Sequence, residues 1–214
     1  MKPIHITVIV IITVFIFVIN ACTQKMANQP ARHVNREATD KRGNLILLGK
    51  STRKRLAQPP FNDWFNKNYA GYSIDSNTAN QIKPLLKNKQ FFLFMGTWCG
   101  DSRREVPRMY KILDYCQVKL SRIELINLNN SDTAYKQSPG HEERGLNILR
   151  VPTLLIYENG HEVGRVVESP VASLEKDMLA IVTGQPYEHR YKNATTTKSV
   201  NVADTTRVQQ PARQ

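Results

Sequence analysis

Five consecutive large apolar residues, Phe91 to Met95, lie near the middle of the chain and leave no polar face. This pattern is typical of a central strand in a sheet that is covered on both sides. The stretch ends at Gly96. Apolar residues then recur at the spacing of one helix face, at Val106, Met109, Tyr110, Leu113 and Cys116. The pattern therefore predicts a strand, a turn and an amphipathic helix, in this order.

The segments on either side predict the rest of a mixed α/β domain. Asp75 is expected to cap a helix that Pro84 would kink. The residues that this helix is expected to bury are Ile82, Leu85 and Leu86. The expected elements are a helix over 75–88, a strand over 123–128, a part-helical loop over 129–144, a strand over 151–157, a hairpin turn at Asn159 and Gly160, a returning strand over 162–167 and a helix that begins at Ser169 and Pro170.

The two ends of the chain differ from this middle part. The N-terminal part has the order of an export signal: a lysine, an apolar run from Ile4 to Ile19, and then Asn20-Ala21-Cys22. Polar and basic residues follow, among which Asn44 to Leu48 could form a short strand. The predicted organisation is an export signal over 1–21, a basic flexible tether over 22–60, the domain over 61–185 and a disordered polar tail over 186–214.

The formal charge of +12 makes nucleic acid an obvious candidate partner. However, the basic residues are spread over the termini, and no stacking or groove-reading motif accompanies them. We therefore expect no nucleic-acid binding. The basic tether either holds the chain near anionic lipid headgroups or is simply a soluble linker.

Two of the three cysteines lie in the expected domain, and only Cys99 is placed for chemistry. It stands at the first turn of the predicted helix, where N–H groups and the helix macrodipole stabilise a thiolate, the form that attacks disulfides. Cys116 follows 17 residues later, about 25 Å away at 1.5 Å per residue, and is expected in the core. No cluster of Cys and His has zinc spacing, and we expect neither a metal nor a cofactor.

The sequence Trp98-Cys99-Gly100-Asp101-Ser102, with Pro107 eight residues after the cysteine, resembles the active-site turn of thioredoxin-like proteins. Val151-Pro152-Thr153, with the strand and hairpin that follow, resembles the segment that carries a cis-proline in this family. The resemblance spans about 72–184 and implies a thioredoxin-like three-layer α/β fold, with a central mixed sheet flanked by helices. It implies catalytic roles for Cys99 and Ser102 and substrate contacts at Trp98, Gly100, Asp101, Val151, Pro152 and Thr153.

The chain departs from the family at three positions. Ser102 replaces the second cysteine of the Cys-x-x-Cys motif, Leu93 stands where many thioredoxins bury an acid, and Glu168 stands where glycine is common. The Ser102 hydroxyl could donate a hydrogen bond to the thiolate. The polar loop over 129–144 could cover one side of the site.

The resemblance implies a monothiol thiol–disulfide oxidoreductase or isomerase that forms a mixed disulfide at Cys99. Its expected partners are exported proteins that carry disulfides or thiols, and an external thiol or redox protein for recycling. A non-catalytic binding module that uses the same groove is the alternative. A third possibility follows from Cys-Gly-x-Ser, which also resembles monothiol glutaredoxins that hold an iron–sulfur cluster. The export signal and the lack of a glycine pair after the proline strand count against it.

Ile19-Asn20-Ala21-Cys22 resembles a relaxed bacterial lipobox. The resemblance implies that Cys22 is lipidated and becomes the mature N-terminus, which makes the protein an extracytoplasmic, periplasmic lipoprotein. An uncleaved N-terminal membrane anchor is the alternative, and it leaves Cys99 on the same side of the membrane.

Overall fold

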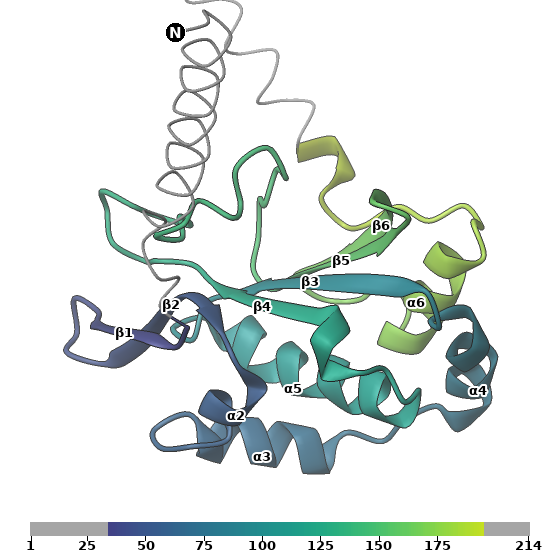
Figure 1. Cartoon of the computed structure of the whole chain (residues 1–214), viewed down its shortest axis with the longest axis horizontal. Coiled ribbons are helices and arrows are strands. Elements are labelled where there is room, and N and C mark those ends of the chain that lie inside the picture. The colour runs from purple at the N-terminus through teal and green to yellow at the C-terminus, as the bar shows by residue number, and fades with distance from the viewer. Residues whose placement is uncertain (1–33, 195–214) are drawn as a thin grey trace, which may run out of the picture. The chain divides into compact units, whose positions relative to one another are not determined.

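The computed structural model describes residues 34–194 (Figure 1). The predicted export signal, the predicted lipidation site Cys22 and the last part of the predicted tail lie outside the described residues. No helix within 34–194 has the length and apolar character needed to cross a membrane. The elements are β1 (Arg36–Thr39), β2 (Leu45–Ser51), α2 (Arg53–Leu56), α3 (Asn62–Gly71), α4 (Ser76–Leu85), β3 (Lys89–Met95), α5 (Gly100–Tyr115), the 3-10 turn η1 (Leu120–Arg122), β4 (Ile123–Asn127), β5 (Thr153–Glu158), β6 (His161–Val167) and α6 (Leu174–Val182).

The strands form one six-stranded mixed sheet in the order β1-β2-β4-β3-β5-β6. Strand β3 is central, because it pairs parallel with β4 and antiparallel with β5. Helix α5 makes the crossover from β3 to β4, as a parallel pair requires. The β5–β6 hairpin turns at Asn159 and Gly160, whose φ angles of 50° and 80° suit a tight hairpin turn. The expected α/β class, with a central mixed sheet flanked by helices, is confirmed.

The two faces of the sheet are covered differently. Phe91, Leu93 and Met95 of β3 belong to a large core with apolar residues of α3, α4, α5 and α6. Figure 1 shows these helices on one side of the sheet. Phe94 belongs to a second cluster, together with Leu155 of β5 and residues between β4 and β5. Helices, sheet and this long connection form the three layers.

The connection between β4 and β5 contains turns but no helix, so its predicted helical part is wrong. The Asn129 N–H donates to Gln137 O and the Lys136 N–H donates to Asn129 O, each at 2.9 Å, which closes a loop. Farther along, the Ser138 hydroxyl bonds to the carboxylate of Glu142 at 2.7 Å. Side-chain bonds of this kind compete with helical hydrogen bonding.

The domain begins earlier than the sequence predicted, because residues 34–60 are not a flexible tether. Strand β2 pairs with β1 on one side and with β4 on the other. Ile46 and Leu47 are almost fully buried, at 1% and 0% exposure. The short strand expected over Asn44 to Leu48 is thus part of the sheet. Residues 22–33 of the predicted tether lie outside the described part of the chain.

Two helix predictions have different outcomes. Helix α4 begins after Asp75, whose side chain accepts a hydrogen bond from the Thr78 N–H at 3.2 Å, as expected. Ile82 and Leu86 are buried, but Leu85 is 38% exposed, against the prediction.

Helix α6 begins at Leu174 and is capped by Ser173, not by Ser169 and Pro170. The Asp177 carboxylate accepts hydrogen bonds from the N–H groups of Val171 and Ala172, which holds the preceding residues in a loop.

The start of the predicted C-terminal tail is packed on the domain. The Tyr187 hydroxyl donates to Asp177 at 3.1 Å, and the Arg190 guanidinium donates to the carbonyl oxygen of Pro170 at 2.8 Å. The prediction of a disordered tail is therefore wrong for residues 187–191, and residues 195–214 lie outside the described part.

Candidate functional site

Cys99 is the N-cap residue of α5, with φ −88° and ψ 127°. Its N–H donates to the carbonyl oxygen of Gly96 at 2.9 Å, and its own carbonyl accepts from the Arg103 N–H at 3.0 Å. The thiol is half-buried and lies at the N-terminal, positive end of the helix dipole of α5. The strand, turn and helix predicted from the apolar pattern thus place this sulfur as expected.

The segment Val151-Pro152-Thr153 lies next to the Cys99 sulfur. The Val151–Pro152 peptide bond is cis. The thiol of Cys99 lies 3.4 Å from the carbonyl oxygen of Val151, within hydrogen-bonding range for sulfur. Thr153 then starts β5 beside Phe94 of β3. The structure therefore brings Cys99, Val151, Pro152 and Thr153 to one end of the central strands.

Ser102 lies one helical turn after Cys99 and is fully buried. Its hydroxyl oxygen accepts a hydrogen bond from the Gly96 N–H at 3.3 Å. The bond that the structure shows for this hydroxyl is therefore with the turn before Cys99, and not with the sulfur. Ser102 therefore holds the backbone of the turn that precedes Cys99.

Trp98 contacts the connection that follows β4 at two points. Its indole N–H donates to the carbonyl oxygen of Leu128 at 2.8 Å, and the centroid of the Tyr135 ring lies 6.0 Å away. A Cβ atom on Gly96 would lie 2.6 Å from Nε1 of Trp98, so only glycine fits there. The long β4–β5 connection does cover one side of the site, as the sequence suggested.

The turn that precedes Cys99 is also hydrogen-bonded to strand β2. The hydroxyl oxygen of Thr97 accepts from the Leu47 N–H at 3.1 Å, and both residues are fully buried. The Thr97 carbonyl accepts from Nε of Arg103 at 2.6 Å. The sequence did not predict these links, because the hairpin that supplies Leu47 was assigned to the tether.

The first turn of α5 carries paired charges. The Arg104 guanidinium lies 2.8 Å from the Asp101 carboxylate and 2.6 Å from that of Glu105. These bonds, chiefly the one with Glu105, raise the pKa of Arg104. Asp101 therefore does not present an unpaired negative charge next to Cys99.

Glu168 follows β6 close to the cis peptide. Its N–H donates to the carbonyl oxygen of Pro152 at 2.6 Å, and its φ of 64° lies in the left-handed region that favours glycine. Its carboxylate accepts from the Tyr191 hydroxyl, and this bond raises the pKa of Tyr191. The Arg150 guanidinium lies 5.1 Å from the centre of the Tyr191 ring. This packing was not predicted, because Tyr191 was assigned to the disordered tail.

Cys116 lies in the core, as predicted. It is 5% exposed, and its sulfur lies 3.6 Å from the carbonyl oxygen of Ala79. Burial raises the pKa of the Cys116 thiol to about 11. Within residues 34–194, no cluster of three His, Cys, Asp or Glu side chains is arranged to hold a metal ion.

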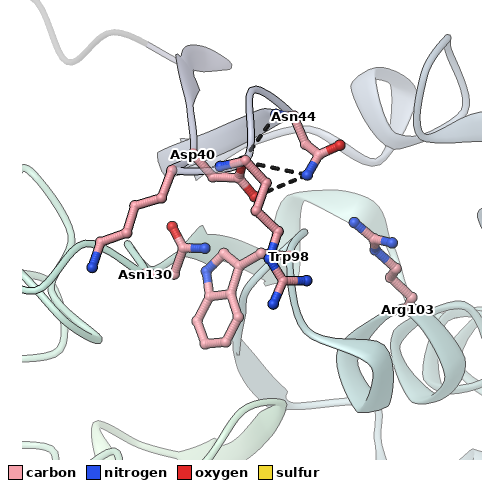
Figure 2. A pocket seen from close by; sticks show the side chains of 7 residues that line it. Asp40, Asn44, Trp98, Arg103 and Asn130 are labelled. Carbon is pink, nitrogen blue, oxygen red and sulfur yellow. Dashed lines mark hydrogen bonds between the residues drawn. The ribbon is translucent and has the colours of Figure 1, made fainter.

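A hollow of about 370 Å³ lies beside Trp98 (Figure 2). It is lined by Asp40, Lys41, Arg42, Asn44, Trp98, Arg103 and Asn130. The Asp40 carboxylate accepts hydrogen bonds from the N–H groups of Arg42 and Asn44 at 2.8 and 2.9 Å. The bond from Asn44 contributes most to lowering the Asp40 pKa. The sequence suggested that Trp98, Arg103 and the loop that contains Asn130 lie at the site, but it did not place the β1–β2 turn with Asp40, Lys41, Arg42 and Asn44 there.

No protein-family model and no curated protein matches the chain. A Pseudomonas aeruginosa protein of unknown function is 18% identical, with a TM-score of 0.39, over 57% of this chain and 81% of that one. A scaffold built to carry an HIV epitope is 16% identical, with a TM-score of 0.32, over 59% of this chain and 99% of that one. Similarities of this size carry no argument about function, which has to come from the site.

Proposed function

We propose that the protein is a thioredoxin-like monothiol thiol–disulfide oxidoreductase or isomerase that reacts with exported proteins through Cys99. The observation that carries the proposal is the position of the Cys99 sulfur at a helix N-terminus, 3.4 Å from the carbonyl oxygen of Val151. A reactive thiol needs a site that favours its charged form, and a polypeptide substrate needs backbone groups to pair with. The helix N-terminus at Cys99 and the backbone of Val151 support the proposal on these two points.

The first step would be attack of the Cys99 thiolate on one sulfur of a substrate disulfide. A bond forms between Sγ of Cys99 and that sulfur, the substrate S–S bond breaks, and the other sulfur leaves as a thiolate. The helix N-terminus stabilises the attacking anion before the reaction. A substrate segment extended along Val151 would bring its sulfur to the reacting atom.

The second step has to use a thiol from outside this site. Ser102 holds the position of a resolving cysteine, and Cys116 is buried in the core. If another thiolate of the same substrate attacks the mixed disulfide, Cys99 is released and the substrate is isomerised without net oxidation. If two external thiols act in turn, the substrate is reduced and the external thiols end as a disulfide.

The test is the second-order rate with which the full-length protein forms a mixed disulfide with a cysteine peptide activated as an aryl disulfide. In the full-length chain with Cys22→Ala, Cys99→Ser should abolish the reaction, while the matched variant Cys116→Ala should keep the rate of the Cys22→Ala protein. Trapping of mixed disulfides on Cys99 in cells would then identify the substrates. A Cys99 thiol no faster than a free cysteine peptide would contradict the proposal and favour the binding module.

We further propose that Cys22 carries lipid and holds the domain outside the cytoplasm, on the basis of the apolar run and the small residue that precede it. Mass spectrometry of the mature protein tests this directly. A chain that begins at Cys22 with added acyl mass is the expected result. A chain that begins at Met1 without acyl mass would favour the uncleaved anchor.

A further inference from the structure

The hollow beside Trp98 has an excess of positive charge. Its lining includes the cations Lys41, Arg42 and Arg103 against one carboxylate, Asp40. Both oxygens of Asp40 accept hydrogen bonds from its own hairpin, including the Asn44 amide at 3.3 Å. Lys41 also pairs with Asp132, but this pair is highly exposed and therefore weak. A carboxylate is the simplest group that would balance the remaining charge.

Three different parts of the fold build the hollow. The β1–β2 turn supplies Asp40 and Asn44, the active-site turn and α5 supply Trp98 and Arg103, and Asn130 follows β4. Figure 2 shows Trp98 between Asn130 and Arg103, below the hairpin that carries Asp40. Nε of Arg103 is fixed by the Thr97 carbonyl, and the Trp98 ring is fixed by Leu128. Part of the hollow is therefore preorganised.

Asn130 adds a polar side chain to the lining of the hollow. Its amide group offers hydrogen-bond donors, which suit a carboxylate as the cations do. An acidic residue of a polypeptide therefore matches both the charge and the hydrogen bonding of the hollow.

We propose that this hollow binds an acidic side chain of the polypeptide whose sulfur reacts with Cys99, and so selects disulfides flanked by Asp or Glu. The preference for disulfides flanked by Asp or Glu rests on the proposed function, whereas binding of a carboxylate in the hollow does not. Trp98 lines the hollow and directly precedes Cys99 in the chain, so the hollow lies against the turn that carries the reacting sulfur. The hollow thus gives the monothiol site a substrate preference.

The kinetic test compares two activated cysteine peptides that differ only in Glu or Gln next to the cysteine. At low ionic strength the Glu peptide should react about tenfold faster with wild-type protein. The double variant Lys41→Gln/Arg42→Gln should bring the two rates together. This change keeps the backbone N–H of Arg42 that binds Asp40. The matched variant Lys54→Gln/Lys67→Gln removes the same charge at exposed positions and should keep the preference.

The carboxylate that binds in the hollow could belong to a small acidic thiol instead of a polypeptide. A second pair of probes distinguishes these two ligands. Dithiodipropionate and its diamide are compared with the same two double variants. A preference confined to the small acid, and lost only in Lys41→Gln/Arg42→Gln, would overturn the polypeptide as the ligand. Equal rates within both pairs of probes would overturn the selection altogether.

A binding measurement keeps the site separate from the reaction. In the Cys99→Ser protein, the indole N–H resonance of Trp98 is followed during titration with N-acetyl-glutamate or N-acetyl-glutamine. The acid should shift the resonance, the amide should not, and Lys41→Gln/Arg42→Gln should abolish the response. No shift with the acid would overturn the site even if Cys99 is reactive. A shift together with an unreactive Cys99 would confirm the carboxylate site and contradict only the proposed function.

Discussion

The sulfur of Cys99 lies 3.4 Å from the carbonyl oxygen of Val151, although 52 positions separate the two residues in the chain. Cys99 is set by the turn from β3 into α5, and Val151 by the entry into β5. Because β3 and β5 are neighbours in the sheet, their ends meet. A disulfide bound along Val151 would therefore meet the thiol directly.

Ser102→Cys should convert the site into a dithiol. The new thiol would lie one helical turn from Cys99, within reach of a disulfide bond. We expect a reversible bond between Cys99 and the introduced thiol, and stoichiometric reduction of insulin by the pre-reduced variant without any added thiol, measured by turbidity. The wild-type protein should form mixed disulfides and release them only when small thiols are added.

Ser102→Ala is the matched control for this prediction. It also removes the hydroxyl that accepts from the Gly96 N–H, at a cost of about 1 kcal/mol in the free energy of unfolding. It should gain no reductase activity. If Ser102→Cys forms no bond and gains no activity, the groove is not arranged for exchange.

Cys116 should be almost inert in the native protein. With its pKa raised to about 11, about one thiol in a thousand is ionised at pH 8, and the sulfur is buried. Iodoacetamide should therefore modify Cys99 at least about 100-fold faster, as followed by peptide mass spectrometry. In urea the two rates should become similar. Comparable rates in the native state would contradict the assignment of Cys99 as the reactive thiol.

Gly96→Ala should destabilise the active-site turn. The added Cβ would lie 2.6 Å from Nε1 of Trp98, so the indole has to move away from the Leu128 carbonyl. We expect a loss of about 1–3 kcal/mol in the free energy of unfolding in urea, as for overpacking elsewhere. Gly71→Ala is the control, because its Cβ meets nothing within 4 Å, and it should be neutral or slightly stabilising. Equal stabilities of the two variants would refute the steric account.

Lowering the pH should decrease the stability of the protein, because protonation of His189 removes a hydrogen bond in the C-terminal segment. Its Nδ1 atom accepts from the Tyr191 N–H at 3.2 Å, so the neutral ring is the bound form. Burial, followed by Arg165, lowers the pKa of His189 below its usual value of 6.5. As the pH falls, His189 therefore takes up a proton in the unfolded state before it does so in the folded state. Its contribution to the free energy of unfolding is complete above about pH 6.5 and is lost as the pH falls through the lower pKa of the folded state. Urea unfolding at pH 7.5 and 5.5 measures the loss.

His189→Gln provides the control, because glutamine offers an acceptor but does not titrate. The difference in unfolding free energy between the two pH values should be smaller in this variant than in the wild type. An unchanged difference would assign the pH dependence to other groups.

The parts of the fold that follow from local pattern were predicted correctly. The apolar run before Gly96 specifies a central strand, Asn159 and Gly160 specify a hairpin turn, and the side chain of Asp75 caps α4. Each of these signals acts within a few residues. The same holds for Cys99, because its position at a helix N-terminus depends only on the turn that precedes it.

The features that were missed depend on distant contacts. Leu47 is buried only because β2 joins a sheet whose next strand, β4, is more than 70 positions away in the chain. Helix α6 begins later than predicted because the Asp177 carboxylate accepts hydrogen bonds from N–H groups in the loop before the helix. The basic hollow needs the β1–β2 turn next to Trp98, so a sequence pattern at the active-site motif alone does not reveal it.

The hydrogen bond from the Leu47 N–H to the hydroxyl of Thr97 makes strand β2 a reporter on the site. The donor and the acceptor are fully buried, so this amide exchanges its hydrogen with solvent only when the structure opens. If the turn at Thr97 opens by itself, the Leu47 amide will exchange faster than that of Ile46, its neighbour in the same strand. If the two amides exchange together, β2 and the turn before Cys99 form a single cooperative unit, and the β1–β2 hairpin unfolds and refolds together with the turn that positions Cys99.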